Sequence, residues 1–336
     1  MTCVATHQFG GDERADHVTA VALFGQTLFV GTKKRLEALI YDPKEKKFAP
    51  DTESKVQGGS GTGFEVTNIR KEPKQLLVST MDGYTLYDGK SWSSESVGPI
   101  NDLLTYEDRL WIARNRGLED KVGQDWKEQK IPSIKLNPTR SSRIRSLAVG
   151  PDGVLWMGSE FGIYSFTAKE KRWGGQLYGD YQNILNDIIT NEKGNSQLCF
   201  GNLVNRIDVD AENQKLLICT ETGLSIFDGK DQWKTVQGDY EILSSEEGRK
   251  TRVKKKGNVE LPSPNVTVAA YIGGILWLGT PGGLVRVEGD KTECFDTGNG
   301  FPASAITSLA HDPASNSLFV GTEKGLAVLS PVSAAS

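Results

Sequence analysis

Short apolar runs, each followed by a polar turn, recur along this chain. The clearest example is "SLFVGTEKGLAVL" (Ser317–Leu329), in which two apolar segments flank a turn that contains glycine. Apolar runs of four to eight residues bounded by turn residues predict β-strands, and two of them around a short turn predict a β-hairpin. The local pattern therefore indicates a β-hairpin and raises the question of why the chain repeats it.

The hairpin pattern occurs seven times, and every copy begins with leucine. The copies are "LFVGTKKRL" (28–36), "LLVSTMDGY" (76–84), "LWIARNRGL" (110–118), "LWMGSEFGI" (155–163), "LLICTETGL" (216–224), "LWLGTPGGL" (276–284) and "LFVGTEKGL" (318–326). A small residue always occupies the fourth position, and six copies have a turn glycine four residues later. Two copies break a rule: Arg35 replaces the turn glycine, and Arg114 replaces the Thr or Ser of the other copies.

Each hairpin has a partner strand before it, and the first six also have another after it. The earlier strand opens with an apolar residue, and the later strand opens with an aromatic residue after a turn. The opening residues are Val18, Val66, Ile100, Ile144, Val204, Val266 and Ile306. Four strands repeating about every 48 residues are typical of the blades of a β-propeller. We call the small residue at the fourth position of each copy the small slot, and we expect it to let neighbouring sheets approach closely.

The predicted fold is an all-β, seven-bladed β-propeller of four-stranded antiparallel blades, forming one domain over 1–336. The predicted blade cores are 18–48, 66–97, 100–130, 144–176, 204–236, 266–297 and 306–330. The last blade has too few residues after "LAVL" for an outer strand, so residues 2–9 are predicted to complete it and close the ring.

The segment "NGFPASAITSLAHDPASNSLFVGTEKGLAVL" (299–329) resembles the two-component regulator propeller repeat. "NVTVAAYIGGILWLGTPGGLVRV" and "IRSLAVGPDGVLWMGSEFGIYSF" are similar to it as well, and the resemblance extends over nearly the whole chain as repeats. It implies a propeller fold. It also implies a sensor region outside a membrane that is joined to a transmembrane helix and a kinase.

Composition and charge narrow the function classes. The net charge is −4, 37% of the residues are apolar and 37 are glycine, which is typical of a folded chain with many tight turns. This balance disfavours nucleic-acid binding, and no apolar run is long enough for a membrane span. The N-terminus lacks the features of a signal peptide, and the four cysteines form no CxxC pair. We therefore expect a cytoplasmic monomer with reduced thiols, or a nuclear one.

Two long segments between blades, 177–203 and 238–264, mark one face of the propeller as the functional face. In a four-stranded meander these links lie on the same face as the turns between second and third strands, here called the top face. Long loops on a rigid scaffold commonly carry function. The second segment contains the basic run "RKTRVKKK" (249–256). Alternatively, the two segments are extra hairpins that cover a sheet edge, and the basic run is solvated.

Candidate ligand-binding residues lie at the starts of the first strands and in the adjoining top turns. They are Lys33, Arg35, Asn68, Asp102, Arg114, Arg116, Arg143, Arg145, Asn205 and Arg206, with Arg249, Lys250, Arg252, Lys254, Lys255 and Lys256 from the basic run. Arginines grouped in this way suit carboxylate, sulfate or phosphate. The alternative is structural pairing, for example of Arg145 with Asp102.

Catalytic motifs are not evident in the sequence. The three histidines are predicted to lie too far apart for one metal site, no phosphate loop or nucleophile elbow is present, and we expect no cofactor. The favoured function is a non-catalytic scaffold that binds a protein or an anionic ligand: an acidic peptide, a sulfated or uronic glycan, or a phosphate head group.

The alternative function is a polysaccharide (uronate) lyase, in which a base abstracts a proton while arginines neutralise the carboxylate. The candidate residues for that chemistry are His17, Tyr178, Tyr181, Arg143, Arg145 and Arg206. One pocket that contains His17 or a tyrosine together with two arginines would favour the lyase.

Overall fold

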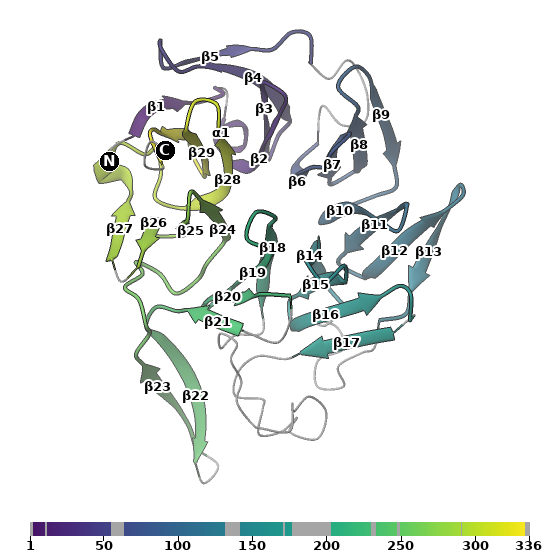
Figure 1. The fold of residues 1–336 in the computed structure, drawn as a ribbon, viewed down its shortest axis with the longest axis vertical. Coiled ribbons are helices and arrows are strands. Elements are labelled where there is room, and N and C mark those ends of the chain that lie inside the picture. Colours follow the sequence, from purple (N-terminus) through teal and green to yellow (C-terminus); the bar gives the residue numbers. More distant parts are fainter. Residues whose placement is uncertain are drawn as a thin grey trace.

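Seven four-stranded antiparallel sheets form a ring around a central channel (Figure 1). The computed structural model describes residues 3–10, 12–54, 64–131, 142–170, 172–176, 203–229, 233–246, 249–289 and 291–332. The only helical turns in these ranges are α1 (Glu13–Asp16) and the 3₁₀ turn η1 (Thr297–Asn299). The predicted seven-bladed all-β propeller is therefore confirmed.

The first four blades follow one another along the chain. Blade 1 contains β2 (Val18–Phe24), β3 (Thr27–Thr32), β4 (Leu36–Asp42) and β5 (Lys47–Pro50). Blade 2 contains β6 (Val66–Lys71), β7 (Leu76–Thr80), β8 (Gly83–Tyr87) and β9 (Trp92–Ser96). Blade 3 contains β10 (Asp102–Tyr106), β11 (Arg109–Arg114), β12 (Gly117–Val122) and β13 (Asp125–Gln129). Blade 4 contains β14 (Ile144–Val149), β15 (Leu155–Ser159), β16 (Gly162–Thr167) and β17 (Arg172–Gln176).

The last three blades include the closure of the ring. Blade 5 contains β18 (Val204–Asp210), β19 (Lys215–Thr220), β20 (Gly223–Phe227) and β21 (Trp233–Val236). Blade 6 contains β24 (Val268–Ile272), β25 (Ile275–Thr280), β26 (Gly283–Glu288) and β27 (Lys291–Phe295). Blade 7 contains β28 (Ile306–Asp312), β29 (Ser317–Thr322), β30 (Gly325–Leu329) and the N-terminal β1 (Cys3–His7).

Strand β1 completes blade 7, as predicted, by pairing antiparallel with β30 from Cys3 opposite Leu329 to His7 opposite Leu326. Gly325 begins β30 in a left-handed conformation with φ of 124°. A Cβ atom on this glycine would lie 2.4 Å from the His7 carbonyl oxygen. Glycine is therefore required here both by the turn and by the close approach of the closing strand.

The repeat positions form the contact between neighbouring blades. The seven opening residues are no more than 1% exposed, and the second strands supply much of the remaining core. In blade 1, a Cβ on Gly31 would lie 2.4 Å from Val66 Cγ1 of blade 2. Gly158 of blade 4 has the same relation to Val204 of blade 5, again at 2.4 Å. The small slot thus receives the branched side chain that opens the next blade.

A separate hairpin, β22 (Tyr240–Glu246) and β23 (Arg249–Lys255), lies between blades 5 and 6. Its base is fixed to blade 5: the Gln237 amide donates to Asn258 Oδ1 at 2.8 Å, and Asn258 Nδ2 donates to the Thr235 carbonyl at 2.8 Å. In Figure 1 the hairpin extends outward, away from the ring. Half of the predicted 238–264 insertion is therefore a hairpin that points away from the channel.

Filling the small slot should weaken the contact between blades 1 and 2. Gly31→Ala places its methyl group 2.4 Å from Val66 Cγ1, and overpacking of this kind costs about 1–3 kcal/mol of unfolding free energy. Ser79→Ala at the equivalent slot of blade 2 adds no atoms and is the control. Urea denaturation of both variants measures the difference, and equal stabilities would contradict the packing role of the slot.

The ring closure should be sensitive to pH through His7. Its ring lies 4.9 Å from that of Phe9 and 5.2 Å from that of Phe48. Burial lowers the pKa of His7 below its ordinary value of 6.5, against the opposing effect of Glu37 and Asp16. The unfolded chain then takes up the proton first, so stability is complete above about pH 6.5 and falls as the pH drops through the lowered pKa.

Denaturation at pH 7.5 and 5.5 tests this expectation in the wild type and in His7→Gln. The loss at low pH should be smaller in the variant, but not absent, because burial also lowers the pKa of His17 and His311. The same loss in both proteins would show that His7 does not contribute.

Candidate functional site

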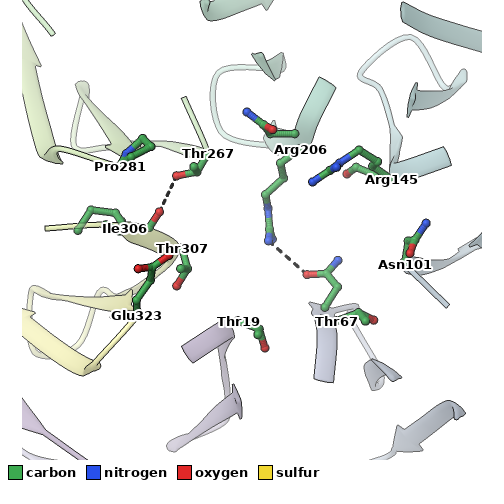
Figure 2. A pocket seen from close by; sticks show the side chains of 14 residues that line it. Thr19, Thr67, Asn101, Arg145, Arg206, Thr267, Pro281, Ile306, Thr307 and Glu323 are labelled. Carbon is green, nitrogen blue, oxygen red and sulfur yellow. Dashed lines mark hydrogen bonds between the residues drawn. The ribbon is translucent and has the colours of Figure 1, made fainter. Parts of the chain in front are cut away.

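A polar cavity of about 280 Å³ opens at the top mouth of the central channel. It is formed where the first strands begin, by residues from all seven blades. The lining residues are Thr19, Thr67, Asn68, Asn101, Arg145, Ser146, Asn205, Arg206, Thr267, Pro281, Ala305, Ile306, Thr307 and Glu323. Figure 2 shows Arg145 and Arg206 extending into the opening, with Glu323 and Thr307 across from them. None of the described lining residues is aromatic.

One repeat position, directly after the opening residue of each blade, ties neighbouring blades together around this cavity. Its side chain donates a hydrogen bond to the backbone carbonyl of the next blade's opening residue at four junctions. The bonds are Thr67 to Ile100 (2.5 Å), Asn101 to Ile144 (2.6 Å), Asn205 to Val266 (2.7 Å) and Thr267 to Ile306 (2.7 Å). We call this set the inter-blade clasp.

The clasp is incomplete at the other three junctions. The hydroxyl groups of Thr19 and Thr307, in blades 1 and 7, are buried without a hydrogen-bond partner among the described residues. Blade 4 has Arg145 at this position, where the other blades have Thr or Asn. Arg145 is 41% exposed and forms a 3.7 Å ion pair with Glu160. Its guanidinium therefore retains donors that can face the cavity.

Arg206 crosses the channel mouth. It comes from β18 in blade 5, where its Nε donates to Asp208 Oδ1 at 2.7 Å, and its Nη1 donates to Asn68 Oδ1 of blade 2 at 3.2 Å (Figure 2). Burial lowers the pKa of Arg206, but the carboxylates of Asp208 and Asp102 outweigh this effect, and the net shift is upward. Arg206 is thus a fixed cation held between two blades.

Asp102 is the buried anion beneath this mouth, with a side chain that is 1% exposed. Arg70 Nη2 donates to Asp102 Oδ2 at 2.8 Å, and Asn68 Nδ2 donates to Oδ1 at 2.6 Å. The amide of Leu147 donates to Oδ2 at 2.7 Å. The alternative, a structural pair of Arg145 with Asp102, is not formed: Arg70, from β6, pairs with the carboxylate, and Arg145 pairs with Glu160. Asp102 does not line the cavity; it supports Asn68, which does.

The two residues that break the hairpin rules have structural partners. Arg114 forms an ion pair with Glu119 at 3.2 Å, and its Nη1 donates to the Pro99 carbonyl at 2.9 Å. Arg35 pairs with Glu37, and its Nη2 donates to the Phe9 carbonyl at 3.3 Å, which ties blade 1 to the chain after β1. Neither residue lines the cavity.

The remaining candidates on the rim divide into two groups. Asn68, Arg145, Asn205 and Arg206 line the cavity, whereas Lys33, Arg116 and Arg143 do not. Arg143 instead forms an ion pair with Glu160 at 3.2 Å. In the basic run, Arg249, Lys250, Arg252, Lys254 and Lys255 belong to strand β23, and Lys256 follows it and pairs with Asp239 at 3.0 Å. The basic run and the channel mouth are therefore two separate regions.

The arrangement needed for the lyase is not formed by the described residues. His17 is the C-cap residue of α1 and does not line the cavity; the described lining contains Arg145 and Arg206 but no histidine or tyrosine. Burial and the charge of Lys33 lower the pKa of His17, opposed by Glu323 and Glu65. Tyr178 and Tyr181 lie outside the described residues.

Several lining residues were not found from the sequence. Thr19, Thr67, Asn101, Thr267 and Thr307 share the position after the opening residue, so the repeat alignment contained the signal. Glu323 lies in the second-to-third-strand turn of blade 7. Only closure of the ring brings this turn to the channel mouth.

Neither a metal site nor a membrane helix is found in the described part of the chain. No group of three or more His, Cys, Asp or Glu side chains there could hold a metal ion. Within the same residues, no helix is both long and apolar enough to span a bilayer.

The fold is similar to that of sensor-system domains of known structure. The extracellular domain of BT4673 from B. thetaiotaomicron, described as a one-component or hybrid two-component system, superposes with a TM-score of 0.67 at 15% identity over 98% of this chain and 40% of that one. The extracellular domain of the hybrid two-component system BT3049 gives a TM-score of 0.61 at 15% identity, over 94% and 40% of the two chains. The chain thus spans about 40% of the length of these two structures.

A computationally designed protein, Ika8, also matches, with a TM-score of 0.55 at 11% identity over 98% of this chain and 99% of that one. No family model matches the chain, and no curated protein matches it. The resemblance to two-component regulator propellers is confirmed at the level of the fold. The predicted cytoplasmic or nuclear location is wrong on this comparison, because the similar sensor-system domains are extracellular.

Removing the buried anion should destabilise the ring. Asp102→Ala leaves Arg70 without its carboxylate and Asn68 without its acceptor, and breaking a buried pair in this way costs about 3–5 kcal/mol. Glu170→Gln removes the exposed 3.2 Å pair with Arg172 and should cost about 1 kcal/mol or less. Thermal and urea denaturation compare the two variants. A loss at Asp102 no larger than at Glu170 would contradict the supporting role of this carboxylate.

Proposed function

We propose that this protein is a non-catalytic ligand-binding propeller of the sensor type, which takes a small polar ligand with a carboxylate group in the cavity at its channel mouth. The observation that carries the proposal is that polar and charged side chains from several blades meet in one cavity. Arg145, Arg206, Asn68, Asn101 and Asn205 come from four blades to line one cavity, so a bound molecule contacts several blades at once.

The donors favour a carboxylate. An arginine guanidinium has five N–H donors in a planar fork that matches the two oxygens of this group. Arg206 uses one donor on Asp208 and one on Asn68. Asparagine and threonine side chains around the two arginines add polar partners without charge. Because binding pockets for larger molecules are lined mainly by apolar and aromatic residues, this lining favours a small and polar ligand.

The similar structures support a sensory role outside the cytoplasm, since they are extracellular domains of one- and two-component systems. Fold alone does not decide function. The site therefore carries the proposal, and we prefer binding over the lyase because, among the described residues, His17 does not join the two arginines in the lining.

Titration calorimetry of the full chain with hexanoate and glucuronate tests the carboxylate site. Arg145→Gln should weaken binding about tenfold or more, because it removes a hydrogen bond to a charged group. Arg116→Gln, an exposed arginine outside the cavity lining, is the control and should bind like the wild type.

A second control replaces residues 240–255 with a short glycine-serine turn, which removes the outward hairpin and all of its basic run except Lys256. Ligand binding should persist, because the hairpin extends away from the ring. If Arg145→Gln binds normally, or if only the hairpin variant loses binding, the cavity is not the site.

A further inference from the structure

Among the residues that the structure describes, the charges around the cavity are balanced, although the sequence suggested a group of basic residues there. The described part of the lining contains Arg145, Arg206 and one carboxylate, Glu323. Asp208 neutralises Arg206, and Glu160 lies between Arg145 and Arg143. The three positive charges of these arginines are therefore matched by the three negative charges of Glu160, Asp208 and Glu323. A polyanion such as a sulfated glycan gains little from such a mouth, since its attraction scales with net opposite charge.

The charges are also separated in space. The two arginines enter the cavity from β14 and β18, in blades 4 and 5, whereas Glu323 lies in the turn before β30 in blade 7. Figure 2 shows Glu323 on the side opposite Arg145, with Arg206 between the two sides. The cavity thus presents hydrogen-bond donors with positive charge on one wall and an acceptor with negative charge on the other.

From this polarity, and building on the proposed function, we infer that the ligand is a zwitterion with its charges at opposite ends: a short peptide or an ω-amino acid. Its carboxylate lies against Arg145 and Arg206, and its ammonium group lies against Glu323. The uncharged Asn and Thr side chains between the walls suit the amide or methylene section. A ligand with only a carboxylate leaves Glu323 unpaired, and complementary charges of this kind give specificity more than raw affinity.

Calorimetry of the full chain with matched probes tests the inference. Triglycine represents the peptide and 6-aminohexanoate the ω-amino acid; hexanoate lacks the ammonium group, and hexylamine lacks the carboxylate. At least one zwitterion should bind about tenfold or more tighter than both single-charge probes. The stronger of the two zwitterions distinguishes a peptide from an ω-amino acid.

The variants separate this inference from the proposed function. Glu323→Gln should remove the preference for the zwitterion by weakening zwitterion binding, and hexanoate should bind at least as tightly as before because a like charge is removed, whereas Arg145→Gln should weaken both. Lys324→Gln, in the same turn but outside the cavity lining, should change neither. Hexanoate or glucuronate binding as tightly as the zwitterions, with Glu323→Gln silent, would overturn the zwitterion and leave the carboxylate site intact. No binding of any probe at millimolar concentration would overturn both.

Discussion

The contact on which the whole ring depends is the fit of one branched side chain into one small slot. Val66 lies against Gly31, and Val204 lies against Gly158, at distances that leave no room for a Cβ atom. A single four-stranded sheet cannot bury both of its faces, so each blade is stable only against its neighbours. The slot sets how closely the sheets approach. The pairing of β1 with β30 completes blade 7 and closes the ring.

The inter-blade clasp holds the same neighbouring blades together by hydrogen bonds at the channel mouth. Thr67 and Asn101 each bond the carbonyl of the next blade's opening residue, so the residues that line the mouth also hold the ring together. Where Arg145 takes this position, the clasp is absent and a cation enters the cavity. The break in the repeat that matters for ligand binding is thus the replacement of Thr or Asn by Arg145 in the inter-blade clasp. The two residues that break the hairpin pattern, Arg35 and Arg114, are explained by local ion pairs.

One of the two arginines of the site, Arg206, is held in place by its partners. Arg206 is held by Asp208 and Asn68, and Asn68 is held in turn by Asp102 and its partner Arg70. A preorganised donor loses little freedom when a ligand arrives. Glu323 and Arg145, at the two walls, are the residues through which the proposed ligand would be distinguished from a simple acid.

The repeat by itself determined the fold, because hairpin periodicity, small slots and a missing last strand are local or strictly periodic features. Val18 and its six equivalents are all buried, and the N-terminal segment completes blade 7 as predicted. Only the tertiary structure decided the chemistry of the mouth, since closing the ring brings together residues far apart in sequence. Arg206 reaches Asn68 across the channel, Asp102 pairs with Arg70 rather than Arg145, and the basic run extends away from the mouth. Spacing along a chain does not report which side chains meet across an axis, and therefore the balance of charge at the site could not be predicted from the sequence.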